Sequence, residues 1–304
     1  MPKRQFATPI ALDRAGKACQ FFGNFEAKID GSIKIDDQLA LTTQTDPEID
    51  AHLPQELQRI PLLRVVYEGQ LGGPGVHKIY AFSRALRLTS AAPVLAAGTL
   101  FLEDGTFHFH PRDNREWSWG PTKQAITLED CQAAARIFAE TLRIAELEMD
   151  AYNRLTNAHR FFDNAYEQSN ADMAIVGFTT ALEGMLLNSE QELSFRFCLR
   201  IAQFLGSTPK QMQEIFAIAK DLYTCRSKIV HGAPVRKDSE LAATYVVDQV
   251  APSAGRLAQD VLRKVYELGL SRVFESGERV DRLFTELLFA DDHESVIRSH
   301  ASDS

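Results

Sequence analysis

The stretch LYTCRSKIVHG, residues 222–232, carries two side chains whose chemistry suits a phosphodiester. The guanidinium of an arginine such as Arg226 can bind two phosphate oxygens at once, and the imidazole of a histidine such as His231 can act as a general acid or base. On an ideal helix, residues five apart lie about 140° apart around the axis, so these two side chains do not share a face. Gly232, followed by Pro234, predicts that the helix ends at His231. Spacing alone leaves two interpretations open: an anion site, or a histidine that complements the helix dipole beside a salt-bridged surface arginine.

Two stretches upstream, TTALEGMLL and FRFCLRIAQFL, add to this pattern. Together with LYTCRSKIVHG, which is similar to an R-x4-6-H motif, they resemble the HEPN superfamily, and its Apea-like branch in particular, over roughly residues 150–270. The resemblance implies a small helical bundle that dimerises through this domain, so that the motifs of two protomers line one cleft. It also implies a metal-independent endoribonuclease that needs no cofactor.

The resemblance assigns the catalytic roles to Arg226 and His231. His231 would move protons at the 2'-hydroxyl or at the leaving 5'-oxygen, and Arg226 would hold the charge that grows on phosphorus. The expected products are a 2',3'-cyclic phosphate, or a 3'-phosphate, and a 5'-hydroxyl. Both roles agree with the chemistry of the two side chains.

Glu183 matches the acidic residue of the family's ALE-like stretch. It could orient Arg226 or His231, and it could equally be a buried partner of Arg200. Both interpretations stay open at the level of the sequence.

Three neighbours of the motif are further candidates for supporting the site. Tyr223 is either a core residue or a support for the site. Ser227 is polar, as in many members of the family, but smaller than the asparagine or histidine often found there. Lys228 is interpreted as a solvated charge that helps to attract RNA.

Two classes of function follow from the resemblance. The leading expectation is an RNA-cleaving effector of antiviral defence or of a toxin kind, whose N-terminal domain senses an unknown trigger, positions RNA or restrains the nuclease. The alternative is a catalytically silent HEPN module that dimerises and binds a protein or nucleic acid. The defence context comes from the family alone.

Composition bounds these expectations. The chain has 304 residues, 45% of them hydrophobic, and a formal net charge of -8, which is unlike the broad basic surface of a nonspecific nucleic-acid binder. Between Arg196 and Glu240, however, the sequence contains eight basic residues and four acidic ones, so this segment is locally basic. No stretch is apolar enough for a membrane span or a secretory signal, so a cytoplasmic protein is expected. The four cysteines are widely spaced and form no C-x-x-C pair, which favours buried thiols over a metal or redox site.

The chain changes character near residue 127, which predicts an α+β protein. Residues 1–127 are expected to form an α/β domain with a mixed sheet, residues 128–290 a helical bundle, and residues 291–304 a disordered tail. The β-like runs are IDGSIKIDD, LLRVVYEG, KIYAFSRALRL and GTLFLEDGTFHFH, the last with a hairpin at Asp104-Gly105. A helical pattern capped by Thr127 or Asp130 follows, and further helices are predicted at about 170–187, 193–205, 208–231, 238–270 and 278–288.

Two constellations in the first half also carry chemistry. In FHFHP, strand alternation places His108 and His110 on one face, as some metal sites require, and Glu103, Asp104 or Asp113 could complete a metal hydrolase. A solvent-facing hairpin explains the same pattern. The glycine cluster GQLGGPG lacks the lysine and the serine or threonine of a phosphate-binding P-loop, and no strand-to-helix context is expected there, so it is interpreted as a turn. Trp117 and Trp119 are expected to cover the junction between the two halves or to stack on a base.

Overall fold

The computed structural model describes residues 15–22, 25, 29–59, 62–70, 74–92, 94, 98–103, 106–111, 125–150, 153–188, 191–233 and 243–302. The described residues form two compact units. One, here called the sheet unit, runs to Glu146, and the other, here called the helical unit, begins at Leu147. The protein is therefore of the α+β class, as expected. Trp117, Trp119, Asp104 and Asp113 lie outside the described residues.

The sheet unit is built on six strands in the order β2-β3-β4-β1-β5-β6. The strands are β1 (Ala15–Phe22), β2 (Ser32–Lys34), β3 (Leu39–Thr42), β4 (Leu63–Gln70), β5 (Gly98–Glu103) and β6 (Thr106–Pro111). Every strand pair is antiparallel, so the expectation of a mixed sheet was wrong. The predicted hairpin is confirmed in its strands, because β5 and β6 pair directly, with Glu103 opposite Thr106.

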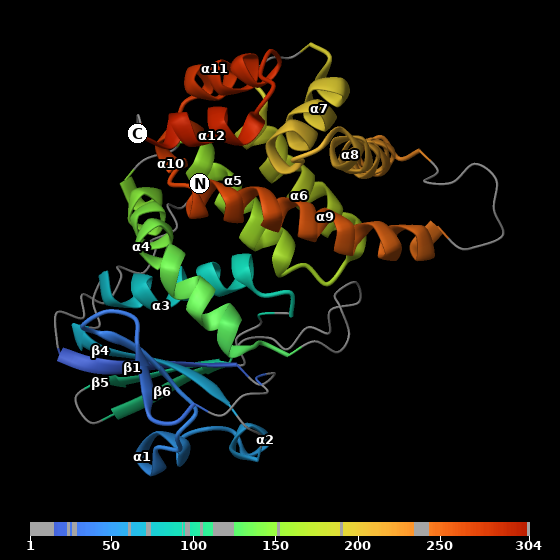
Figure 1. Cartoon of the computed structure of the whole chain (residues 1–304). Helices are drawn as coiled ribbons and strands as arrows, with labels where there is room; N and C mark the ends of the chain where they lie inside the picture. Colours follow the sequence, from blue (N-terminus) through green and yellow to red (C-terminus); the bar gives the residue numbers. More distant parts are fainter. Residues whose placement is uncertain are drawn as a thin grey trace, which may run out of the picture. The chain divides into compact units, whose positions relative to one another are not determined.

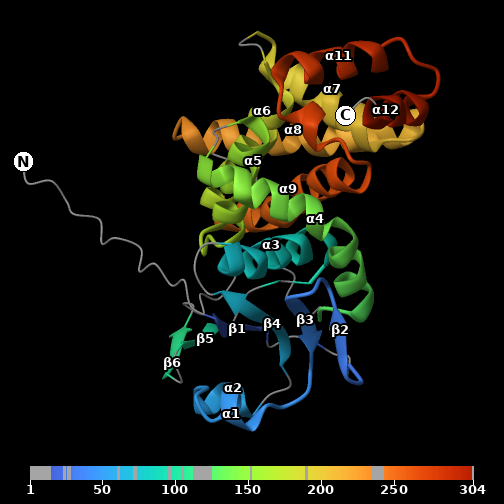
Figure 2. The ribbon, with the colours of Figure 1, turned by 90° about the vertical axis from the view of Figure 1, so that its left-hand side faces the viewer.

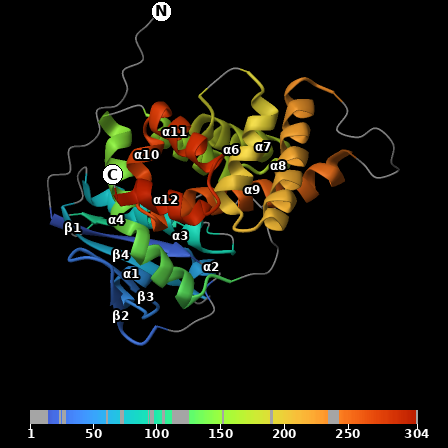
Figure 3. The ribbon, with the colours of Figure 1, turned by 45° about the horizontal axis from the view of Figure 1, so that its top comes forward.

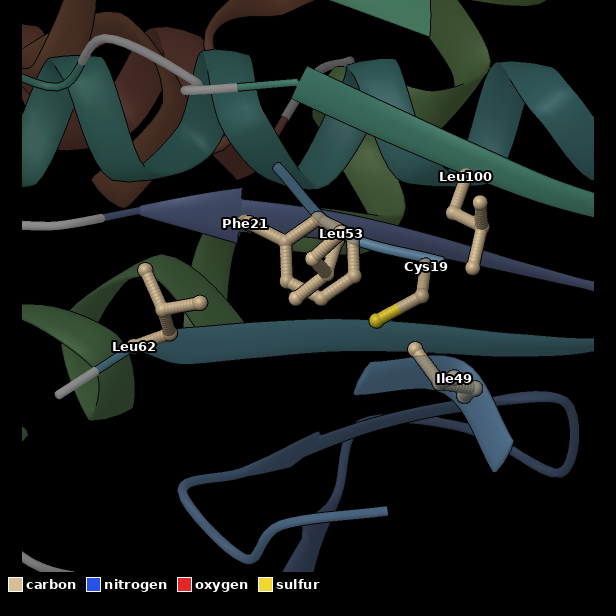
Figure 4. Close-up of a cluster of buried hydrophobic side chains, with 6 residues drawn as sticks. All are labelled: Cys19, Phe21, Ile49, Leu53, Leu62 and Leu100. Atoms are coloured by element: carbon tan, nitrogen blue, oxygen red, sulfur yellow. The ribbon is translucent and has the colours of Figure 1, made fainter. Parts of the chain in front are cut away.

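Helices cover both faces of this sheet (Figure 2). The short helices α1 (Pro47–Asp50) and α2 (Gln55–Gln58) lie on one face. There Ile49 and Leu53 pack on Cys19, Phe21, Leu62 and Leu100 (Figure 4). On the opposite face Gln20 accepts a hydrogen bond from Ser83 of α3 (Pro74–Thr89). Because strand side chains alternate, residues 19, 20 and 21 of β1 serve these two layers in turn.

The run KIYAFSRALRL was predicted as a strand and is part of α3. Its apolar residues Ile79, Phe82 and Leu86 are all buried and recur at three and four residues, which is the helical period. The helical spacing of the apolar residues therefore outweighed the strand propensity on which the prediction was based. The glycine cluster consequently lies between strand β4 and helix α3, so the expectation of no strand-to-helix context was also wrong; the missing P-loop lysine and hydroxyl still argue against phosphate binding.

Helix α4 (Leu128–Asp150) belongs to the sheet unit through Glu146, so the division falls near residue 147 and not near 127. Its ring contact with α3 joins Phe82 and Phe138, whose centroids are 6.0 Å apart. The sequence offered Thr127 or Asp130 as the cap at the N-terminus of α4, and in the structure the two residues cap it reciprocally. The Asp130 amide donates to Thr127 Oγ1 at 3.1 Å, and the Thr127 amide donates to Asp130 Oδ2 at 2.9 Å.

The helical unit contains eight helices within its described residues. They are α5 (Arg154–Tyr166), α6 (Ala171–Leu186), α7 (Leu193–Leu205), α8 (Pro209–Val230), α9 (Ala243–Glu267), α10 (Ser271–Phe274), α11 (Gly277–Leu287) and α12 (His293–Ser302) (Figure 1). Helix α6 is central, because it contacts α5, α7, α8 and α9. None of the helices in the described ranges combines the length and apolar character that crossing a bilayer requires.

The predicted helices 170–187, 193–205, 208–231 and 278–288 agree with α6, α7, α8 and α11 to within about two residues. The disordered tail expected at 291–304 is instead helix α12 over most of its length. The cause is tertiary: Ile297 is buried, and Glu294 pairs with Lys264 of α9 at 3.5 Å. A polar sequence with one buried apolar residue gave no local sign of this docking.

Candidate functional site

Helix α8 positions both motif residues through its own start and stop signals. Thr208 caps the first turn by accepting from the Gln211 amide at 3.2 Å, and Pro209 occupies the first helical position. The helix ends at His231, after which Gly232 adopts a φ of 65° and its amide donates to the Ile229 carbonyl at 3.2 Å. The predicted glycine stop is confirmed, and it leaves the His231 side chain exposed at the C-cap.

Helices α6 and α8 contact each other in the helical unit (Figure 3), and Glu183 of α6 holds Arg226 of α8 from the side. Its Nη2 atom lies 2.9 Å from Glu183 Oε2, and only 24% of the arginine side chain and 17% of the glutamate side chain are exposed. The guanidinium carbon is 5.9 Å from the centroid of the Tyr223 ring, one turn earlier on α8. Arg226 therefore has a fixed place, with an ion pair on one side and an aromatic ring on another.

These contacts distinguish between the two roles that the sequence left open for Glu183, a support for Arg226 or a buried partner of Arg200. Glu183 pairs with Arg226. Arg200 pairs with Asp281 Oδ1 at 2.6 Å and donates to the Leu186 carbonyl, so it has other acceptors. Of the two alternatives, the structure thus has Glu183 beside the motif arginine.

Burial and charge compete at Glu183. Burial raises the pKa of the Glu183 carboxyl above its ordinary value, while the Arg226 charge and a hydrogen bond from the Tyr223 hydroxyl act in the opposite direction. The pKa of Tyr223 is raised by its own burial and by the neighbouring Glu183 charge. The tyrosine consequently remains a neutral donor to the carboxylate at neutral pH.

Tyr223 combines the two roles that the sequence left open. Its ring packs on Phe197 of α7 with centroids 5.2 Å apart, and its hydroxyl bonds Glu183. Ser227 and Lys228 are half-buried on the last turns of α8. The Ser227 carbonyl accepts from the His231 amide at 3.1 Å, so this residue also shapes the helix end.

The structure does not bring Arg226 and His231 onto one face of α8. Five helical residues separate their directions by about 140°. Arg226 points towards α6, where Glu183 lies, and His231 is exposed at the helix end. A site that uses both side chains on one phosphate would need a second surface, such as the motif of a second protomer.

A second set of polar contacts lies at the C-terminal end of α6 and was not found from the sequence. Arg200 of α7 and Arg154 of α5 donate to the carbonyls of Leu186 and Leu187, respectively. Asn188 bridges this set: its amide group donates to Asp281 Oδ2 at 3.1 Å and accepts from Arg154 at 3.1 Å. These contacts fix the end of α6 one turn beyond Glu183. No local pattern links residues so far apart in the chain.

The histidine pair of the FHFHP stretch gains no support as a metal site. His108 is exposed on β6, and the side chain of His110 lies outside what the structure describes. Within the described part of the chain, no group of three or more His, Cys, Asp or Glu side chains could hold a metal ion. All four cysteines are buried, as predicted.

Comparison of the chain with protein-family models, with curated proteins and with solved structures finds no match. The function is therefore argued from the site itself.

Proposed function

We propose that the protein is a metal-independent endoribonuclease of HEPN type. The observation that carries this proposal is the surroundings of Arg226 on α8. Its guanidinium is held by Glu183 of α6 and lies near the Tyr223 ring, and α8 ends at the exposed His231. A fixed guanidinium can stabilise charge on the phosphate, and an exposed imidazole can transfer a proton, which are two of the tasks in cleavage by a 2'-hydroxyl.

The reaction needs one proton to leave the 2'-hydroxyl and one to reach the 5'-oxygen. The 2'-oxygen displaces the 5'-oxygen at phosphorus while His231 takes the first proton or supplies the second, and water accepts or donates the other proton. The products are a 2',3'-cyclic phosphate and a 5'-hydroxyl. Arg226 stabilises the added negative charge on the phosphate oxygens.

Arg226 also has a donor to spare. Its Nε atom is buried and has no hydrogen-bond partner among the described residues. An unpaired buried donor costs about 1–3 kcal/mol, so an additional oxygen ligand that reached it would be bound favourably. Because this atom is buried, a phosphate would reach it only after the arginine side chain shifts.

The proposal includes a homodimer through the helical unit. The directions of Arg226 and His231 differ by about 140° on α8, and two motifs related by a two-fold axis would supply the convergence that one helix lacks. An RNA-cleaving effector of defence or a toxin, with a trigger read by the sheet unit, is the biological setting that the HEPN resemblance suggests.

The test is to incubate the purified protein with total RNA in excess chelator and to map the fragment ends. We expect cuts with 2',3'-cyclic phosphate and 5'-hydroxyl ends, and their loss in His231→Ala and in Arg226→Ala, both of which should fold and dimerise. Cleavage that is unchanged in both variants would sink the assignment of the site.

A silent binding module is the second candidate, and one observation favours it. The Arg226 charge is already neutralised by Glu183 at 2.9 Å, which reduces its attraction for a phosphate. This candidate predicts that the protein dimerises normally and cleaves no RNA with or without its trigger, whereas the nuclease predicts cleavage under at least one of these conditions.

A further inference from the structure

The outer flank of helix α8 carries a stripe of residues that begins at His231 and leads away from it. Ser227, Lys220 and Phe216 lie four, eleven and fifteen residues before His231, and such spacings return to within about 60° of the same direction on a helix. The flank covers about 22 Å of the helix. Lys220 is exposed, and within the described residues its side chain makes no hydrogen bond or ion pair, while its carbonyl accepts from the Thr224 hydroxyl at 2.8 Å.

An exposed aromatic ring lies at the far end of this stripe. Phe195 of α7 contacts Phe216 with ring centroids 6.0 Å apart in an edge-to-face arrangement. The Phe195 side chain is nevertheless 56% exposed. An edge-to-face contact uses at most one face of each ring, so Phe195 keeps a ring face for another partner.

Lys220 and Phe195 lie on neighbouring turns of the α7–α8 contact. Lys220 is close enough to Cys198 for its charge to lower the pKa of that thiol, although burial raises this pKa to about 11. Cys198 follows Phe195 by one helical turn. The nearest acidic residues on α8, Glu214 and Asp221, point about 100–120° away from Lys220.

We infer that Phe195 and Lys220 form a binding site for a single-stranded RNA segment that follows the flank of α8 towards the proposed catalytic histidine, about 16–22 Å away along the helix. An unpaired base stacks on Phe195, and Lys220 contacts the backbone phosphate between this base and His231. The inference rests on the proposed function, because it takes RNA as the ligand. It adds the substrate class: unpaired RNA, since a base inside a duplex cannot offer its face to the ring.

A second exposed phenylalanine shows why Phe195 is singled out. Phe289, between α11 and α12, is 86% exposed, and Asp291 and Asp292 beside it are exposed as well. Carboxylates repel phosphates, so this ring is less suited to RNA than Phe195, whose neighbours include one exposed carboxylate, Glu192, and one basic residue, Arg196. Phe289 therefore provides a matched control for the loss of an exposed aromatic ring.

The experiment measures binding in the uncleaving His231→Ala background of the full chain. The probe is a single-stranded RNA of about ten nucleotides that contains one 2-aminopurine, whose fluorescence falls on stacking. We expect Phe195→Leu to weaken binding about tenfold and to abolish the quenching, Phe195→Trp to retain both, and Phe289→Leu to change neither. Lys220→Gln should reduce the slope of log affinity against log salt by roughly 0.7.

Equal binding and quenching in Phe195→Leu, or equal affinity for a duplex of the same sequence, would overturn the inference, as would no binding at all. The outcomes also separate the two proposals. Cleavage by the wild-type chain together with unchanged binding in Phe195→Leu would leave the ribonuclease intact and remove this site. Binding that depends on Phe195 in a chain that never cleaves would leave the RNA site and remove the catalytic assignment.

Discussion

Glu183 connects the motif arginine to the rest of the bundle. The pair with Arg226 joins α6 and α8 across 43 residues of sequence. This partly buried ion pair restricts the guanidinium to a narrow range of positions. If Arg226 acts on phosphorus, a fixed guanidinium can be placed to bind the transition state more tightly than the bound RNA.

Replacement of Glu183 by Gln should therefore lower kcat for RNA cleavage at least tenfold and leave KM within about threefold, because positioning is lost while the positive charge that attracts RNA is kept. Cleavage kinetics at several RNA concentrations provide the measurement. Glu267→Gln, which removes a more exposed partner of Arg263, is the control. An unchanged kcat in Glu183→Gln would show that the pair is structural only.

Tyr223→Phe separates the hydroxyl from the ring. The substitution keeps the packing on Phe197 and removes the hydrogen bond to Glu183, so we expect a loss of about 1 kcal/mol in the free energy of unfolding. Urea denaturation followed by circular dichroism measures it. Equal stability would mean that the hydroxyl is paired with water at least as well as with the carboxylate.

The types and spacing of Arg226 and His231 indicated the candidate site, but the residues that these side chains contact could not be predicted from the sequence. Arg226 and His231 could be identified because they lie five residues apart on one predicted helix, and recognising this spacing does not require knowledge of the fold. The choice between Arg226 and Arg200 as the partner of Glu183 depends on how α6, α7 and α8 pack, which no local pattern specifies. Asp281 lies 81 residues after Arg200, and for the same reason it was not foreseen.

At the scale of elements, the termini of α8 follow from local backbone chemistry. Gly232 has a φ of 65°, and a Cβ added there would meet nothing within 4 Å. The cost of a side chain at this position is therefore backbone strain and not a steric clash.

Gly232→Ala should reduce the free energy of unfolding by about 1–2 kcal/mol. Gly184 in α6 is the matched control, because it is helical and a Cβ there also meets nothing within 4 Å. Gly184→Ala should raise stability by up to about 1 kcal/mol, since alanine is the better helix former. Chemical denaturation of both variants tests this opposition in sign. A loss of stability in Gly184→Ala would contradict it.

Elements with local signals were predicted well, and those that depend on packing were not. The start of α4 was predicted from Thr127 or Asp130 as a cap, and both take part in it. The separate helix α5 was missed because neither glycine nor proline precedes it, although Asn153 and Thr156 form a reciprocal cap that the spacing N-x-x-T could have indicated. The chain also gave no local sign of α12, whose docking depends on Ile297 and Lys264.

At the scale of the molecule, the contacts at the end of α6 join helices from both ends of the helical unit. Burial opposes ionisation of Asp281, but hydrogen bonds from Arg200 and Asn188 outweigh it, and the pKa of Asp281 lies below its ordinary value of 3.8. A lowered pKa in the folded state means that the ionised carboxylate stabilises the fold above pH 3.8, and that this contribution is lost as the pH falls through the folded-state pKa.

Asp281→Asn should therefore be less stable than the wild type at pH 6, and the difference in the free energy of unfolding should shrink towards pH 3. Denaturant titrations at the two pH values measure the difference. Asp291→Asn, at an exposed position in the turn before α12, should differ little from the wild type at either pH. A difference for Asp281→Asn that stays constant with pH would contradict the assignment of this carboxylate as the ionised partner of Arg200.

The contact between Arg200 and Asp281 also has a consequence for the order of synthesis. Arg200 leaves the ribosome 81 residues before the carboxylate that neutralises it, a delay of about 4–16 s at usual elongation rates. Once His231 has been made, about 50 further residues must be translated before Asp281 supplies the charge that completes the end of α6. In the proposed ribonuclease, the end of α6 one turn beyond Glu183 would therefore be complete only after Asp281 has been translated.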